Sequence, residues 1–254
     1  MIDFCVITGS GFYDFPGATD LVDRQIQTRH GSVGFAEGRY RGQRIAFIPR
    51  HRHGHALLPN MIDYRANCAA MAALKPRAVI ATSICGILNK TIPLGRLMIF
   101  GDLFFPDNRL PSGEICSMFS EEEQAGRGHL MFSNPFYDVS GWFSPKEALT
   151  GMTYGHVNGP RFNSRKEISF LARYCDAISQ TCGPETILCN ELETPYILLG
   201  FGVDYANGVM EENTPIEELE DNMEKSQAML TWGINRIFDA GDEIAYSNFV
   251  YRIN

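Results

Sequence analysis

Short apolar runs that end at small or turn-forming residues recur along the chain. Such runs, rich in branched and aromatic side chains, predict strands of a largely buried sheet. They are "DFCVIT" (3–8), "RIAFIPR" (44–50), "RAVIATSICG" (77–86), "LGRLMIFGDLFF" (94–105) and "PYILLGFGV" (195–203).

Helical spacing of apolar residues separates several of these runs. The stretch 59–75, "PNMIDYRANCAAMAALK", repeats apolar residues close to the period of a helix. Ser164 and Glu167 have the spacing of a capping box, which predicts a helix start. The stretch 184–193 precedes the strand at 195–203 as a further helix-to-strand step.

The last long amphipathic stretch begins at residue 214. We predict Thr214 as its cap, Pro215 in its first turn and Glu217 three residues after the cap. Residues 106–150 are rich in Pro, Ser, Gly and Glu, and we expect long loops there. The alternation of strands and helices indicates one α/β domain over residues 1–254.

Composition excludes several classes of protein. Of 254 residues, 44% are hydrophobic and 20% charged, as in ordinary globular domains, and the net charge of −8 disfavours nucleic acid as a partner. The seven cysteines are scattered without a CxxC pair, which favours reduced thiols. We see no signal peptide and no apolar run long enough for a bilayer, so we expect a cytoplasmic protein with no membrane partner.

The first glycine turn, "GSGFYD", follows a strand and invites a dinucleotide-binding interpretation. Asp14 stands where the third glycine should be, and Pro16 breaks the helix that should follow, so that interpretation fails. The backbone N–H groups and the Ser10 hydroxyl remain suited to an anion. A tight turn without a ligand is an equal alternative.

The stretch "IPRHRHGHALLP" (48–59) concentrates basic residues. On an extended segment, His51, His53 and His55 would share one face and suggest a metal site, as in an amidohydrolase-like enzyme. The other histidines (30, 129 and 156) show no ligand spacing. Arg50 suits an oxyanion better, because its guanidinium offers a bidentate fork. We favour an anion site; a metal site and a solvated loop stay open.

Three further positions are candidate ligand contacts. The stretch 82–86, "TSICG", is a strand end with two hydroxyls that suit an anion or simply bond the backbone. Phe162 stands between a turn and a helix, as a platform for a planar ring or a core anchor. Asp204 ends an apolar strand. It is a candidate hydrogen-bonding partner of a ligand, with a pKa raised by burial, or it simply caps the next loop.

Taken in order, these motifs resemble one family over nearly the whole chain. They are "GSG", "PRHRHGHALLPNMIDYRAN", "ATSICG", "NGPRFNSRKE", "TCGPE" and "GVDYANG". The set is similar to the trimeric purine nucleoside phosphorylase and methylthioadenosine phosphorylase family. The resemblance implies a mixed, distorted central β-sheet flanked by helices, a homotrimer, and active sites near subunit interfaces.

The resemblance also implies a role for each matching residue. The phosphate-binding residues would be Ser10, Arg50, His51, Ser83, Ile84 and Thr181. The base-binding residues would be Phe162, Asn163, Asp204 and Ala206. Gln180 would lie at the ribose, and His129 would reach the 5′ end of a neighbouring subunit's ribose. Asp204 and His51 would be the catalytic residues, with phosphate as co-substrate and neither metal nor organic cofactor.

Several positions depart from the family pattern. Ala206 replaces the second acid of a "DYD" motif, Asn163 stands where 6-oxopurine enzymes often have Glu, Gln180 replaces a methionine, and His53 replaces a glycine. Because an ionised Asp204 accepts from an exocyclic amine, we expect phosphorolysis of 5′-methylthioadenosine. A 6-oxopurine nucleoside phosphorylase and a catalytically weak binding protein on this fold are the alternatives.

Overall fold

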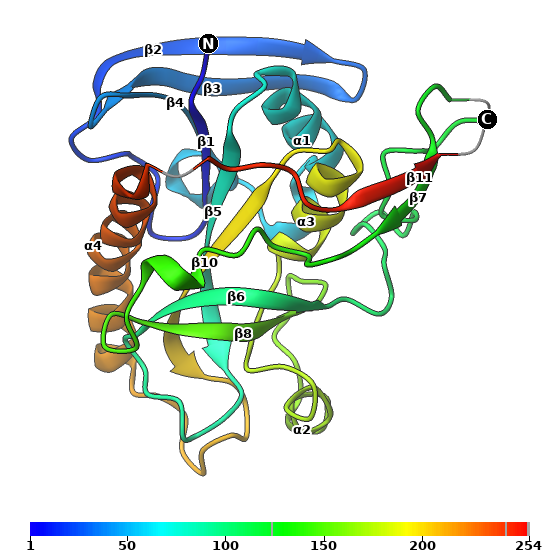
Figure 1. Cartoon of the computed structure of the whole chain (residues 1–254). Helices are drawn as coiled ribbons and strands as arrows, with labels where there is room; N and C mark the ends of the chain where they lie inside the picture. The colour runs from blue at the N-terminus through cyan, green and yellow to red at the C-terminus, as the bar shows by residue number, and fades with distance from the viewer. Residues whose placement is uncertain (123, 242, 253–254) are drawn as a thin grey trace.

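A computed structural model describes residues 1–122, 124–241 and 243–252, and within them the expected α/β fold with a mixed sheet is confirmed (Figure 1). The main sheet has the order β10-β6-β8-β9-β5-β1-β4-β3-β2. Its strands are β1 Phe4–Thr8, β2 Thr19–Thr28, β3 Gly31–Tyr40, β4 Gln43–Pro49, β5 Ala78–Ile87, β6 Leu97–Phe104, β8 Ala148–His156, β9 Ala177–Ser179 and β10 Tyr196–Tyr205. A small second sheet pairs β7 (Gly128–Met131) with β11 (Phe249–Arg252).

The main sheet closes on itself at one end. β5 pairs with β9 in antiparallel and with β10 in parallel, so β5, β10, β6, β8 and β9 form a ring. The β5–β10 register slips between Gly202 and Asp204, where a bulge lies. This closure is the distortion expected of the sheet, and the bulge re-aims the residues that follow it.

Both faces of the sheet are buried, because successive side chains of its central strands enter opposite cores. Phe4 and Val6 of β1 lie in one core, and Cys5 and Ile7 lie in the other. This explains why the strand runs read as continuously apolar and not as alternating.

Helices cover the two faces (Figure 1). α1 (Tyr64–Ala73) packs against α3 (Cys182–Glu191) on one side, and α4 (Ile216–Ala240) packs against β10 on the other. The short α2 is Arg165–Leu171, and its capping box between Ser164 and Glu167 is confirmed.

Two expected helix starts differ from the sequence prediction. Pro215, not Thr214, is the N-cap of α4, because the Thr214 hydroxyl accepts a hydrogen bond from the Tyr205 N–H at 3.2 Å. The stretch 59–75 begins as a 3₁₀ turn, Pro59–Met61, and α1 starts only after Asp63, whose carboxylate accepts from Ala66 N–H at 3.0 Å.

The segment 106–150 is mostly irregular, as expected, with β7, the 3₁₀ turn Ser140–Trp142 and the start of β8 within it. The hairpin of β2 and β3, which extends the sheet beyond β4, escaped the sequence analysis. All seven cysteines are free and buried. None of the helices in the described part of the chain has both the length and the apolar character needed to span a membrane.

Candidate functional site

The carboxyl ends of four parallel strands bring most of the expected site residues to one edge of the sheet. β1, β4 and β10 each run parallel to a neighbour, with β5 at the centre of the group. Ser10 follows β1, Arg50 and His51 follow β4, Ser83 lies in β5, and Asp204 lies near the end of β10. The carboxyl ends of parallel strands are where ligands bind in open α/β sheets.

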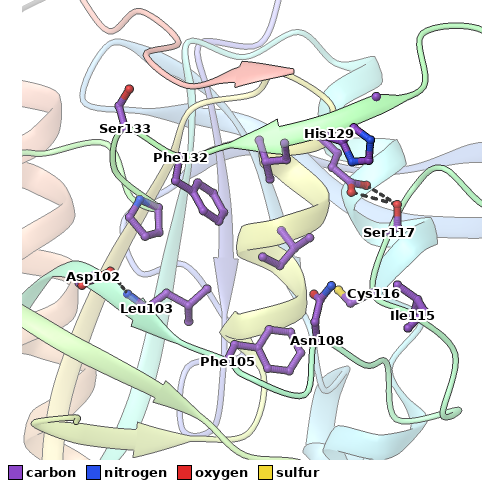
Figure 2. A pocket seen from close by; sticks show the side chains of 15 residues that line it. Asp102, Leu103, Phe105, Asn108, Ile115, Cys116, Ser117, His129, Phe132 and Ser133 are labelled. Carbon is purple, nitrogen blue, oxygen red and sulfur yellow. Dashed lines mark hydrogen bonds between the residues drawn. The ribbon is translucent and has the colours of Figure 1, made fainter. Parts of the chain in front are cut away.

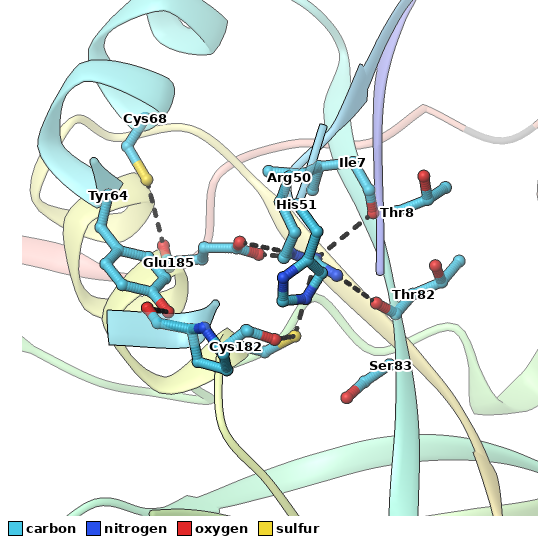
Figure 3. A network of polar contacts seen from close by, with 12 residues as sticks. Ile7, Thr8, Arg50, His51, Tyr64, Cys68, Thr82, Ser83, Cys182 and Glu185 are labelled. Atoms are coloured by element: carbon cyan, nitrogen blue, oxygen red, sulfur yellow. Dashed lines mark hydrogen bonds and ion pairs between the residues drawn. The ribbon is translucent and has the colours of Figure 1, made fainter. Parts of the chain in front are cut away.

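Arg50 lies at the centre of this edge with its side chain completely buried (Figure 3). Its Nε and Nη2 donate to the two carboxylate oxygens of Glu185 at 2.7 and 2.9 Å, and Nη1 donates to the Thr82 carbonyl at 2.7 Å. Burial, the largest single influence, opposes the charged form. The charge and hydrogen bonds of Glu185, together with Cys182 and Tyr196, outweigh it, so the pKa of Arg50 lies above its usual value. The expected bidentate fork toward phosphate is therefore occupied by Glu185.

The first glycine turn lies directly against this guanidinium. A Cβ on Gly9 would come within 2.9 Å of Arg50 Nη1, so a larger residue there would displace one or the other. The Arg50 N–H donates to the Thr8 carbonyl at 3.0 Å, which ties the end of β4 to the end of β1. Ser10, partly exposed, comes next in the turn.

His51 is buried beside Arg50 in a defined tautomer. Its Nδ1 lies 2.7 Å from the Leu57 carbonyl, which can only accept, so Nδ1 carries the hydrogen and Nε2 is an acceptor when the ring is neutral. Burial lowers the pKa of His51 to about 4, so the ring is neutral at pH 7. His55 stacks on it at 4.2 Å, and the Tyr13 hydroxyl lies 3.0 Å from His55 Nδ1.

The expectation that His51, His53 and His55 share one face is wrong. The segment is not extended: His53–His55 forms a 3₁₀ turn, and the His53 side chain is 74% exposed while His51 is buried. Within the described residues, no three His, Cys, Asp or Glu side chains are grouped as a metal site would require. The geometry gives no support to the metal interpretation.

Ser83 and Thr181 are buried near Arg50 and His51. They are 2% and 5% exposed, and Thr181 precedes α3 with its hydroxyl 3.6 Å from Cys182 Sγ. The Ser83 hydroxyl lies 3.4 Å from the Ile84 carbonyl and also hydrogen-bonds the Tyr154 side chain. The Thr181 hydroxyl has only its weak sulfur contact among the described residues, so an anion would displace little there.

Asp204 lies farther along β5 than the phosphate candidates. Its register partner is Gly86, and a Cβ on Gly86 would lie 3.5 Å from Asp204 Oδ1 and from Ala206 Cβ. Gly86 is the third residue after Ser83 in β5, which places it roughly 10 Å farther along the strand. That span suits an anion at one end and a base at the other, with a sugar between them. Burial raises the pKa of Asp204 to about 6.

The residues expected around the base and sugar are more exposed. Phe162 is 82% exposed, and the neighbouring Asn163 carbonyl accepts from Asn207 at 2.8 Å. Gln180 Nε2 donates to the Arg161 carbonyl at 3.0 Å, so this side chain tethers the loop that carries Phe162. The methionine that Gln180 replaces in the family pattern has no amide with which to do this.

His129 lies apart from the phosphate candidates within the chain. It is an exposed residue of β7, and it lines a cavity of about 670 Å³ together with Phe105, Ser117 and Glu191 (Figure 2). Neither Arg50 nor Asp204 lines that cavity. The role expected of His129 in a neighbouring subunit stays a prediction.

The sequence analysis missed Glu185 and Tyr196. Glu185 is completely buried, pairs with Arg50, and accepts from the Tyr196 hydroxyl at 2.7 Å. An acid in the "TCGPE" motif, in the first turn of the helix that begins there, was the available signal. A buried carboxylate needs a cation or several donors, and Arg50 was the obvious partner.

Comparisons with known proteins identify the family of the chain. The model of the phosphorylase superfamily matches residues 3–231. A probable 6-oxopurine nucleoside phosphorylase of Dictyoglomus turgidum is 28% identical over 91% of this chain and 90% of its own length. An S-methyl-5′-thioadenosine phosphorylase of Geobacter sulfurreducens is 31% identical over 79% of this chain and 71% of its own.

A solved structure supports the fold. The crystal structure of a methylthioadenosine phosphorylase from an Antarctic soil metagenomic library superposes with a TM-score of 0.78 at 24% identity, covering 96% of this chain and 90% of that one.

Proposed function

The chain belongs to the phosphorylase superfamily as a purine nucleoside phosphorylase, and we propose that its substrates are 6-oxopurine nucleosides and inorganic phosphate. The relative from Dictyoglomus turgidum, which matches 91% of the chain, supports this choice of base over the 6-aminopurine that the sequence alone favours. Phosphate is the co-substrate, and the reaction needs neither a metal nor an organic cofactor.

The observation that carries the choice is the burial of Asp204 at the end of β10 against Gly86, with the apolar Ala206 beside it, and this burial raises the pKa of Asp204 to about 6. A protonated carboxyl donates a hydrogen bond, and a 6-oxopurine offers two acceptors, O6 and N7, on the edge concerned. A purine bound beside Asp204 would exclude water and raise that pKa further. Ala206, in place of a second acid, leaves no other carboxylate within this motif to repel O6.

In the proposed reaction, a phosphate oxygen attacks C1′ while the bond from C1′ to the purine breaks. Ser10, Ser83, Thr181 and the Ile84 N–H would donate to phosphate, and neutral His51 would accept a phosphate O–H at Nε2. Asp204 would donate its proton to N7, so that the purine leaves as a neutral molecule. Phe162 and Asn163 would border the base, and Gln180 would border the ribose.

Phosphorolysis of 5′-methylthioadenosine is the second candidate. The ionised form of Asp204 accepts from a 6-amino group, and the Geobacter sulfurreducens relative supports this substrate. We further propose a homotrimer in which His129 of one subunit approaches the 5′ end of a neighbour's nucleoside. The exposure of His129 supports that role.

The test is base release from inosine, guanosine, adenosine and 5′-methylthioadenosine, with and without phosphate, between pH 5 and 8.5. We expect phosphate-dependent release that favours the 6-oxopurines, with the ratio of inosine to adenosine kcat/KM falling as the pH rises above about 6. Asp204→Asn is the matched control, since its amide donates at every pH and should make the ratio independent of pH. A ratio favouring 5′-methylthioadenosine throughout would select the second candidate, and saturable binding without release would indicate a binding protein.

A further inference from the structure

Glu185 collects three charged or polar donors at a place that solvent does not reach. Its side chain is completely buried on α3, and it accepts from Arg50 Nε and Nη2 at 2.7 and 2.9 Å (Figure 3). It also accepts from the Tyr196 hydroxyl at 2.7 Å. Burying an ion pair away from water costs desolvation free energy, which is offset only if the hydrogen bonds of both groups are satisfied. Its position beside the candidate phosphate site suggests a use beyond stability.

The hydrogen bonds of Arg50 can be assigned one by one. A guanidinium has five N–H groups. Nε uses its own on Glu185, and Nη2 uses one on Glu185 and directs the other toward the Ile7 carbonyl at 3.4 Å and Cys182 Sγ at 3.7 Å. Nη1 donates to the Thr82 carbonyl, and among the described residues no partner occupies its second N–H. Gly9 lies beside Nη1 of the guanidinium.

We propose that Glu185 is a positioning residue that aims Arg50, so that a single Nη1–H, held beside the first glycine turn, is left for phosphate. This N–H is buried in the free chain, and the proposed contact requires phosphate to enter between it and that turn. The inference rests on the proposed phosphate site. Because Glu185 accepts from Nε and Nη2 of Arg50, phosphate cannot form a bidentate pair with these two groups and is kept from binding deeper in the sheet. The phosphate oxygen is thereby kept toward Ser83 and the sugar.

Glu185 also sets the charge of the site. The Arg50–Glu185 pair is neutral as a unit, and His51 is neutral at pH 7. Phosphate would then be held by directed hydrogen bonds and not by a net positive charge, so its affinity should depend little on ionic strength. Removal of the Glu185 charge would leave an uncompensated cation that binds phosphate more tightly and in the wrong place.

The experiment is phosphate titration by calorimetry at two ionic strengths, together with steady-state kinetics, for wild type and Glu185→Gln. We expect the variant to bind phosphate about fivefold more tightly at low salt, with a new salt dependence. Its kcat should fall about thirtyfold or more, because misplacement by a fraction of an ångström is sufficient. An unchanged kcat, or weaker binding of phosphate, would overturn the inference.

Two further variants keep the test decisive if Glu185→Gln does not fold. Tyr196→Phe keeps the charge but loosens the carboxylate, and should lower kcat about threefold with the phosphate Kd unchanged; an unchanged kcat would contradict the inference. Thr186→Val is the matched control, since its hydroxyl bonds only within α3, to the Cys182 carbonyl at 2.6 Å, and should leave kcat and Kd as in wild type.

The inference and the proposed function fail separately. A wild type that binds phosphate but releases no base would contradict the proposed function, while the salt dependence of Glu185→Gln would still decide the inference. A wild type without measurable phosphate binding would overturn both.

Discussion

The two halves of the candidate site are built in different ways. The phosphate half consists of strand ends and one helix start, and Arg50, His51, Ser83 and Thr181 are each at most 5% exposed. The base half consists largely of loops, with Phe162 82% exposed and His129 on an exposed strand of the small sheet. The first half is preformed within one chain, whereas the proposed trimer would complete the second through the ligand or another subunit.

This difference has a physical origin. A small, strongly hydrated anion is recognised by fixed donors, and fixed donors are best supplied by a sheet whose hydrogen bonds already hold them. A planar base is recognised largely by contact area, which a loop side chain such as Phe162 can provide after binding. Substitutions in the two halves should therefore differ in whether stability and activity change together.

The largest effect should come from Arg50→Met. We expect at least a thousandfold loss of kcat/KM and a loss of about 3–5 kcal/mol of stability, because Glu185 is left buried without its partner. Thermal unfolding and kinetics measure the two losses. Arg50→Met combined with Glu185→Leu should recover much of the stability but none of the activity. Recovery of activity in the double variant would show that this half does not bind phosphate.

Asp204→Ala should lose most of the turnover, about a hundredfold, with little change in unfolding temperature. The reason is that, in the proposed reaction, Asp204 contacts the base at the boundary between the two halves. Full activity in this variant, measured by base release under saturating phosphate, would remove Asp204 from the mechanism.

Phe162→Ala should raise the KM for nucleoside about tenfold while leaving the phosphate Kd and the unfolding temperature unchanged. A side chain that is 82% exposed contributes little to the fold of the free chain. If the phosphate Kd changed as much as the nucleoside KM, the two halves would not be independent, and the comparison would fail.

The last effect concerns the pH dependence of stability and not activity. The folded pKa of Asp204 is about 6 against a usual 3.8, so the folded state retains this proton more strongly than the unfolded state. Stability from this group is complete below about pH 4 and is lost as the pH rises through 6. Asp204→Asn should therefore be about 3 kcal/mol more stable than wild type at pH 7.5, with little difference at pH 4. Denaturant unfolding at both pH values measures this, and an equal gain at both would reject the titration as its cause.

Local pattern predicted that a strand end carries Arg50 and His51 and favoured an anion there, while the full set of phosphate contacts was implied by the family resemblance and stays a prediction. It did not predict that Glu185 occupies the Arg50 fork, since that contact joins residues 135 positions apart. It also placed His53 on the wrong face, because the period-two argument assumes an extended backbone and the chain turns there. A local pattern predicts residue types and their order. The contact between Arg50, after β4, and Glu185, in α3, decides which N–H groups of Arg50 remain for a ligand.

The buried cysteines can be used to measure local unfolding of the site by chemical labelling. Cys85 and Cys182 lie under the phosphate half, and burial raises the pKa of both thiols, so a thiol reagent can reach them only during transient exposure. Their labelling rates therefore measure how often that half opens, and saturating phosphate should slow them. Cys175, which packs in a separate cluster with Ile168 and Leu171, should label at a rate that phosphate leaves unchanged.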